Sequence, residues 1–370
     1  MGDREGDDVR GEGRDDAVRG NFVEGKAGKG VHLLTHDVAA QRGEGTAPTW
    51  LYGDREGFRP KDYGLKPKDV PEIAWDPDER TISLINATKA TTKFFYISVY
   101  HKCVGQNGAT LDDAPTTPPP DHPEWPPRCA TFAVALQPRS MVALCQLPDV
   151  PTEADFSDLR ISSDVQTFEP TPADLPDALE NAPTLAFPLH PPDKPFVCTQ
   201  GFGGALTHCM SASTFHAVDF AADVGTPCVA AGDGVVIEIR DSTPEARASG
   251  VGVHTLFEWN ALSIELDNTA DESAGLPPLV CEYVHIREGS ARCKLGDRVR
   301  AGQVVCETGS VGFTPEPHLH FQLTRGSTKK ARTVPFRFAP SNGGAPFVPV
   351  AGIAYCAAGP AALHVTTNGI

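Results

Sequence analysis

The stretch PHLHFQL, residues 317–323, places two histidines one residue apart within an apolar run. In an extended strand, residues i and i+2 point to the same side, so His318 and His320 share one face while Leu319 and Phe321 share the other. The pattern predicts a strand with one apolar face and one face that carries two imidazoles. Taken alone, the pair fits either a half-buried strand with polar residues toward solvent or a metal site, and only the surrounding sequence distinguishes them.

The sequence around this strand is typical of an all-β domain. From Phe196 onward, short apolar runs alternate with turn-forming residues. The runs are HAVDFA (216–221), CVAAG (228–232), GVVIEIR (234–240), ALSIELD (261–267), LVCEYVHI (279–286) and QVVCETG (303–309). The 370 residues include 35 Gly and 34 Pro, and no run shows helical periodicity beyond two turns. We therefore predict a β-sheet domain over 196–345.

The first half of the chain predicts a second all-β unit. Residues 71–165 contain strand-like runs separated by turns, which is typical of a small β-sandwich-like domain. The runs are TISLINA (81–87), KFFYISVY (93–100), CATFAVAL (129–136) and MVALCQL (141–147). Residues 1–70 are charged and Gly-rich, and we expect them to be mostly disordered. Residues 166–195 predict a Pro-rich linker, and residues 346–370 a C-terminal tail.

The charge of the chain narrows its expected partners. The formal net charge is −16, and an acidic surface repels nucleic acid and anionic membranes, so neither is expected to bind. No stretch approaches the roughly 20 apolar residues of a membrane span, and the charged residues 1–20 lack the apolar segment of a signal peptide. The sequence as given predicts a cytoplasmic protein by default, unless the true start differs. It does not indicate an oligomeric state.

The ten cysteines do not form a CxxC pair, so the sequence gives no support to a zinc-ribbon or thioredoxin-type site. An even number of cysteines leaves disulfide pairing open.

Groups that can bind a metal or move a proton gather in three stretches: THCMSASTFHAVDFA (207–221), EYVHI (282–286) and PHLHF. A hydrolytic zinc site needs three protein ligands and an open position for a polarised water. It also needs groups that take the proton and stabilise charge on the attacked carbonyl. Asp219 lies between Val218 and Phe220, where a carboxylate is costly unless it is paired or bound to a metal. An early aspartate with early histidines, and the late histidine pair, would supply such a site.

Four blocks in this order resemble the M23 family, the LytM- and lysostaphin-like zinc endopeptidases that cut peptide bonds in peptidoglycan. The blocks are GFGGALTHCMSASTFHAVDFAADVGTPCVAAGDGVVIEIRD (201–241), EYVHI (282–286), LGDRVRAGQVV (295–305) and TGSVGFTPEPHLHFQL (308–323). The resemblance covers residues 196–340 and implies an antiparallel β-sheet peptidase domain with one zinc ion per chain.

Carried over residue by residue, the resemblance implies that Asp219 and His320 bind zinc, and that His285 and His318 are catalytic. The family's usual first ligand stands four residues before the aspartate, where this chain has Phe215. A branch of the family with a "YAVDFA"-like segment carries its histidine earlier, in a segment similar to Gly201–Gly204 followed by Thr207 and His208. We therefore expect His208 as the third ligand. His216 is the alternative, although at three residues before Asp219 it would tend to face away on a strand.

The implied function is a zinc metalloendopeptidase whose substrate is peptidoglycan cross-links or glycine-rich peptides. The alternative, from another class, is an M23-like domain without catalytic activity that binds peptide or glycan. Whether His208 binds the metal distinguishes the enzyme from the binding module, because without His208 only Asp219 and His320 would hold the metal.

Overall fold

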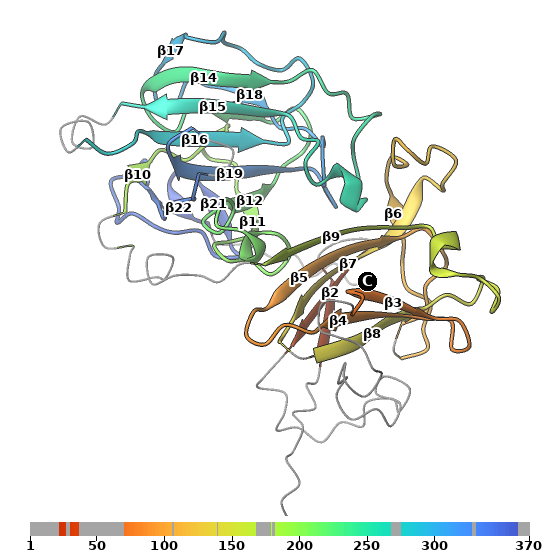
Figure 1. The fold of residues 1–370 in the computed structure, drawn as a ribbon. Coiled ribbons are helices and arrows are strands. Elements are labelled where there is room, and N and C mark those ends of the chain that lie inside the picture. Colours follow the sequence, from red (N-terminus) through yellow and green to blue (C-terminus); the bar gives the residue numbers. More distant parts are fainter. Residues whose placement is uncertain are drawn as a thin grey trace, which may run out of the picture.

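The computed structural model describes residues 22–26, 30–36, 70–105, 107–138, 140–167, 179, 182–267, 275–327 and 331–361 (Figure 1). Strands dominate these ranges, and the helical structure described below consists of three-residue 3₁₀ turns, which confirms the all-β prediction. Frequent Gly and Pro between β-branched runs account for this, because they end each strand after a few residues. Among the described residues, no helix has the length and hydropathy needed to cross a membrane.

The N-terminal domain contains two sheets. The first has the order β1-β2-β7-β5-β9, with β6 paired to β7, and the second has the order β3-β4-β8. The bounds are β1 Phe22–Lys26, β2 Val31–His36, β3 Ile73–Asp76, β4 Thr81–Asn86, β5 Lys93–Val99, β6 Ala114–Pro115, β7 Arg128–Leu136, β8 Ser140–Gln146 and β9 Ile161–Thr167. Residues of both sheets bury one shared core, which includes Ile82, Leu84, Phe95, Phe132 and Leu144.

Two strands lie inside the segment for which the sequence predicts disorder. β2 pairs with β7 in parallel, with Val31 opposite Thr131, and β1 pairs with β2. The prediction of a mostly disordered start is therefore wrong for these strands, and the rest of 1–69 lies outside the described residues. The run VHLLTH (31–36) is short and its partner strand lies about a hundred residues away in the chain, so local pattern carries little sign of it.

The C-terminal domain is built on a nine-stranded sheet with the order β17-β14-β15-β16-β19-β12-β11-β21-β22 (Figure 1). All its pairings are antiparallel. The bounds are β11 Phe196–Gln200, β12 Val218–Ala221, β14 Gly234–Arg240, β15 Ala261–Leu266, β16 Leu279–Val284, β17 Arg298–Val299, β19 His318–Arg325, β21 Ala354–Cys356 and β22 Gly359–Pro360. Two small sheets complete the domain: β13 (Pro227–Val229) with β18 (Val304–Glu307), and β10 (Thr184–Leu185) with β20 (Arg337–Phe338).

Strand β19, which contains both His318 and His320, has the predicted two faces. Leu319, Phe321 and Leu323 of β19 are fully buried in the core of the C-terminal domain. His318 and His320 project from the opposite face, and both are more than nine-tenths buried. A half-buried strand with its histidines in solvent is therefore not what forms.

The described residues 182–195 of the predicted linker and 346–361 of the predicted tail belong to the C-terminal domain. Leu185, Phe187 and Leu189 recur with period two and are buried in its core, and β10 pairs with β20. At the other end, β21 pairs with β11 and extends the large sheet. The predicted boundaries at 195 and 346 are therefore too narrow, because prolines near these short strands make the segments look like loops in the sequence.

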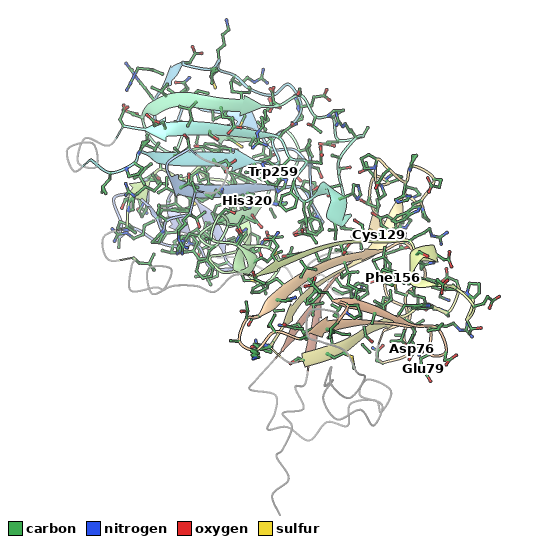
Figure 2. The ribbon with its side chains drawn as sticks, viewed as in Figure 1. Asp76, Glu79, Cys129, Phe156, Trp259 and His320 are labelled. Carbon is green, nitrogen blue, oxygen red and sulfur yellow. The ribbon has the colours of Figure 1, made fainter. Side chains whose placement is uncertain are left out.

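The two domains share a buried contact. Phe95 and Ile97 of β5 face the N-terminal core, whereas Tyr96 on the other face packs with Met210 and Val253 of the C-terminal domain. The loop around the 3₁₀ turn η9 (Val253–Thr255) lies against β5 and β9 (Figure 1). In Figure 2, His320 and Trp259 lie in the C-terminal domain, and Cys129 lies in the N-terminal domain near the contact. Burial of both faces explains why β5 reads as an almost unbroken apolar run.

Candidate metal centre

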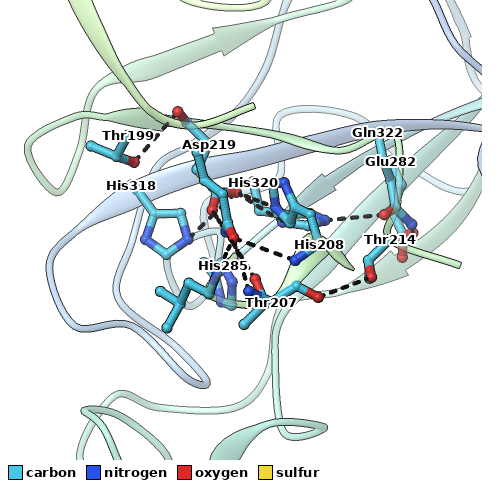
Figure 3. A network of polar contacts seen from close by, with 12 residues as sticks. Thr199, Thr207, His208, Thr214, Asp219, Glu282, His285, His318, His320 and Gln322 are labelled. Atoms are coloured by element: carbon cyan, nitrogen blue, oxygen red, sulfur yellow. Dashed lines mark hydrogen bonds and ion pairs between the residues drawn. The ribbon is translucent and has the colours of Figure 1, made fainter. Parts of the chain in front are cut away.

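Three side-chain atoms from three separate segments meet within hydrogen-bond distance of one another (Figure 3). His208 Nε2 lies 3.3 Å from Asp219 Oδ1 and 3.3 Å from His320 Nδ1, and His320 Nδ1 lies 2.9 Å from Asp219 Oδ1. All three residues are buried, with His208 fully inaccessible to solvent. Two imidazole nitrogens and one carboxylate oxygen are together a donor set for one divalent metal ion.

Sheet register accounts for two of these groups. β12 and β19 are antiparallel neighbours, and Asp219 is the direct register partner of His320. Side chains of directly opposed residues lie on the same face with Cβ atoms about 5 Å apart. The aspartate and the histidine are therefore brought together by backbone pairing alone.

His208 arrives from the loop between β11 and β12. It opens the 3₁₀ turn η8 (His208–Met210), and the loop is closed by a hydrogen bond from the Gly203 amide to the Phe215 carbonyl of 2.7 Å. The positive φ of Gly203 (61°) favours glycine at this turn. The loop folds back so that His208 Nε2 lies 3.3 Å from both Asp219 Oδ1 and His320 Nδ1.

His285 and His318 complete the cluster of predicted residues. The ring centroids of His285 and His318 are 4.6 Å apart, and His318 Nε2 is 3.9 Å from Asp219 Oδ1. His285 follows directly after β16 with a φ of 63°, a conformation that is uncommon for residues other than glycine. The structure thus places all five residues of the predicted site in one cluster.

The alternative ligand, His216, lies elsewhere. Its backbone amide donates to Thr333 Oγ1 at 3.0 Å, and its Nδ1 is 3.2 Å from the Thr333 carbonyl. The ring packs edge-on against Phe202 and Phe215. These contacts are those of a core histidine on the far side of β12 from the cluster.

Hydrogen bonds to the second ring nitrogen set the tautomer of each histidine, because a carbonyl can only accept. His208 Nδ1 donates to the Gly201 carbonyl at 2.8 Å, His318 Nδ1 to the Glu316 carbonyl at 2.8 Å, and His285 Nδ1 to the Val311 carbonyl at 2.7 Å. A neutral ring held in this way keeps its lone pair on Nε2. Such bonds are typical of histidines that serve as ligands or proton acceptors.

His320 has the opposite arrangement. Its Nε2 donates to Gln322 Oε1 at 3.1 Å, and Gln322 Nε2 donates to Glu282 Oε2 at 2.7 Å. These two hydrogen bonds hold the His320 ring with its Nδ1 directed at Asp219. Burial raises the pKa of Glu282, while His320, Gln322 and Arg240 act in the other direction.

Burial and neighbouring groups shift the pKa values of Asp219, His320 and His285. Burial would raise the pKa of Asp219, but His208, His318 and His320 outweigh it and hold that pKa well below its usual range. Burial would lower the pKa of His320, but Asp219 outweighs it and raises that pKa. Burial, with His318 and His320 nearby, holds the pKa of His285 well below its usual value. A cluster that favours an ionised carboxylate and crowds imidazoles around it is suited to a cation.

Known proteins similar to this chain include bacterial endopeptidases. The glycyl-glycine endopeptidase ALE-1 of Staphylococcus capitis is 29% identical over 146 residues, which are 39% of this chain and 34% of ALE-1. The peptidoglycan DD-endopeptidase ShyC of Vibrio cholerae is 32% identical over 117 residues, which are 31% of this chain and 22% of ShyC. The chain thus spans about a third or less of the length of these relatives. No family model matches the chain. The similarity to these LytM- and lysostaphin-type endopeptidases therefore extends over about two-fifths of this chain at most.

Solved structures similar to this chain include M23 catalytic domains. The catalytic domain of the prophage-encoded M23 protein EnpA from Enterococcus faecalis is 28% identical and covers 38% of this chain and 89% of its own, with a TM-score of 0.27. The lysostaphin catalytic domain from Staphylococcus simulans is 25% identical and covers 38% of this chain and 87% of its own, with a TM-score of 0.26.

Asp219, His285, His318 and His320 line a groove of about 390 Å³ in the C-terminal domain. The polar face of the sheet forms its floor, where Glu282 and Gln322 are register partners. Phe257, which is 61% exposed, and Trp259 line one side. Gln166 of β9 also lines the groove, so the N-terminal domain contributes to its wall.

Residues behind the cluster carry weaker sequence signals. Gln322 stands two positions after His320 on one strand, so strand period places it on the same face. No sequence motif marks Glu282. Its place behind His320 becomes visible only from its pairing with Gln322 on the neighbouring strand. Gln200 has no sequence signal, although it forms hydrogen bonds with His208 and Asp219, two of the three residues that could bind a metal.

Proposed function

We propose that this chain is a zinc-dependent endopeptidase that hydrolyses peptide bonds in peptidoglycan. The meeting of His208 Nε2, Asp219 Oδ1 and His320 Nδ1, of which Asp219 and His320 line a groove, is the observation that carries the proposal. The endopeptidase relatives support the reaction class, and ShyC, named as a peptidoglycan DD-endopeptidase, supports the substrate.

The donor atoms fit a zinc ion. Zn–N and Zn–O bonds of about 2.0–2.1 Å at the tetrahedral angle separate ligand atoms by about 3.3 Å. The separations here are 3.3, 3.3 and 2.9 Å. His208 and His320 each use the other ring nitrogen as a donor to a protein oxygen, so both present a lone pair to the same point. In a tetrahedral zinc site, these three protein ligands would leave one coordination position for a water molecule.

A zinc ion bound there would lower the pKa of a water and polarise the scissile carbonyl. His285 and His318 lie beside the ligand residues with lone pairs on Nε2, so either ring could take a proton from the attacking water. In the protonated form, the same Nε2–H can donate to the oxyanion that forms on the carbonyl. The floor of the groove would hold the substrate chain.

Zinc content is the first measurement. We expect about one zinc per chain in wild type and in His216→Ala, and loss of zinc in His208→Ala and Asp219→Asn. His216→Ala is the matched control, because it removes a buried histidine of the same segment that lies outside the cluster.

Hydrolysis is then followed on purified cross-linked peptidoglycan and on pentaglycine, with release of new amino groups as the readout. Cleavage of peptidoglycan by wild type and not by His208→Ala supports the proposal, and cleavage of pentaglycine alone would move the substrate to glycine-rich peptides. A chain that binds peptidoglycan without zinc and without hydrolysis would instead be a binding module, and the proposal would fail.

A further inference from the structure

Gln200, the last residue of β11, links two of the proposed zinc ligands. Its side chain is 5% exposed. Oε1 accepts hydrogen bonds from the backbone amides of Leu206 at 3.0 Å, Thr207 at 2.8 Å and His208 at 3.3 Å. Nε2 donates to Thr207 Oγ1 at 2.9 Å and to Asp219 Oδ2 at 2.7 Å. One amide therefore holds both the turn that carries His208 and the carboxylate of Asp219.

We propose that Gln200 is a positioning residue of the metal centre and sets the distance between His208 and Asp219. The inference rests on the proposed zinc site. Gln200 is the register partner of Asp219 on the neighbouring strand, so its amide starts from a rigid position. The His208 turn is a loop, and three consecutive amides directed at one oxygen fix it to that strand.

The same amide selects which carboxylate oxygen faces the metal. Gln200 Nε2 binds Oδ2 of Asp219, whereas Oδ1 lies 2.9 Å from His320 Nδ1 and 3.3 Å from His208 Nε2. An oxygen that accepts a hydrogen bond on its far side is held in place for one-sided coordination. Gln200 thus favours binding through Oδ1 alone.

The backbone around Gln200 leaves room for this arrangement. A Cβ added at Gly204 would lie 2.1 Å from Cγ of Gln200 and 2.9 Å from its Cδ. The Gln200 side chain can keep its place only when residue 204 lacks a side chain. Gly204→Ala therefore displaces Gln200 without changing any polar group.

Gln200→Glu is the sharpest test. The new carboxylate still accepts from the amides of residues 206–208, but it loses the donor to Asp219 and puts a second negative charge at its Oδ2. We expect zinc affinity, measured by chelator competition, to fall 10–100-fold or more, as for other residues that hold a metal ligand. Gln146→Glu, on β8 of the N-terminal domain, is the matched control and should leave the affinity unchanged.

The cobalt-substituted protein supplies a second readout. The visible spectrum of bound Co²⁺ reports the ligand geometry, and we expect it to change in Gln200→Glu and in Gly204→Ala. If Gln200→Glu does not fold, Gly204→Ala carries the test alone. A folded variant of either kind with zinc affinity within twofold of wild type and an unchanged cobalt spectrum would overturn the inference. Absence of zinc from the wild type would instead overturn the proposed function.

Discussion

The Ser98 hydroxyl joins the N-terminal sheet to the η9 turn of the C-terminal domain, and its removal has a calculable cost. Ser98 Oγ accepts a hydrogen bond from the Val253 amide at 2.8 Å, and it lies 2.7 Å from Thr131 Oγ1. Ser98 is fully buried and Val253 is 4% exposed, so water cannot replace the lost partner without opening the contact. Ser98→Ala leaves the Val253 amide unsatisfied.

A buried donor without a partner costs about 1–3 kcal/mol, which is more than the net loss of an ordinary hydrogen bond. We expect Ser98→Ala to lower the free energy of unfolding by about 2 kcal/mol in urea titrations, with an unchanged m-value. Hydrogen exchange of the Val253 amide should accelerate. Ser163→Ala, an exposed position on the neighbouring strand β9, should change stability by less than about 0.5 kcal/mol.

The reasoning is refuted if Ser98→Ala matches Ser163→Ala in stability and leaves exchange at Val253 unchanged. Such a result would mean that the domain contact opens readily, and that the η9 loop does not depend on the N-terminal sheet.

Three further predictions concern the site, the core and the domain contact. His285→Ala should reduce the rate of hydrolysis by about 10²–10⁴-fold while zinc content stays at the wild-type level, because His285 lies beside the ligand set; loss of zinc in this variant would contradict its assignment. Phe321→Ala should cost about 3–5 kcal/mol of unfolding free energy in thermal or urea denaturation, because the ring is fully buried against Tyr283 and Phe336. Burial lowers the pKa of His254 below its usual 6.5, against the raising effect of Asp121 and Glu258, so the unfolded chain takes up this proton first. Stability should therefore decline as pH falls below about 6.5, and part of that decline should be absent in His254→Gln; identical pH profiles would exclude the effect.

The alternation of side chains along a strand predicts the direction of several site residues, but it does not predict which of them lie together. His318, His320 and Asp219 each lie in a clear strand pattern, so their faces can be predicted from neighbours in the sequence. Their proximity depends on which strands pair, and the register of Asp219 with His320 is a long-range property. In the sequence analysis, the expectation that these residues lie together came from the order of the motif blocks and the family resemblance that this order carries.

The loop ligand and its support are harder to derive. His208 lies in a 3₁₀ turn between two strands, where neither strand nor helix period applies. Its position depends on Gln200, whose three accepted bonds to residues 206–208 and one donated bond to Asp219 have no signature in the sequence. The local sequence does not predict β1, β2 and β10, for a related reason. Short strands are stabilised by distant partner strands and carry little local pattern.

The double burial of β5 bears on how the chain can be divided. A recombinant fragment that starts at residue 182 would keep every residue of the metal cluster, yet it would bare Met210, Val251 and Val253, which now pack on the N-terminal sheet. Contiguous apolar surface of this kind promotes self-association. The C-terminal domain would then be a poor module for grafting onto other proteins unless those three side chains were first made polar.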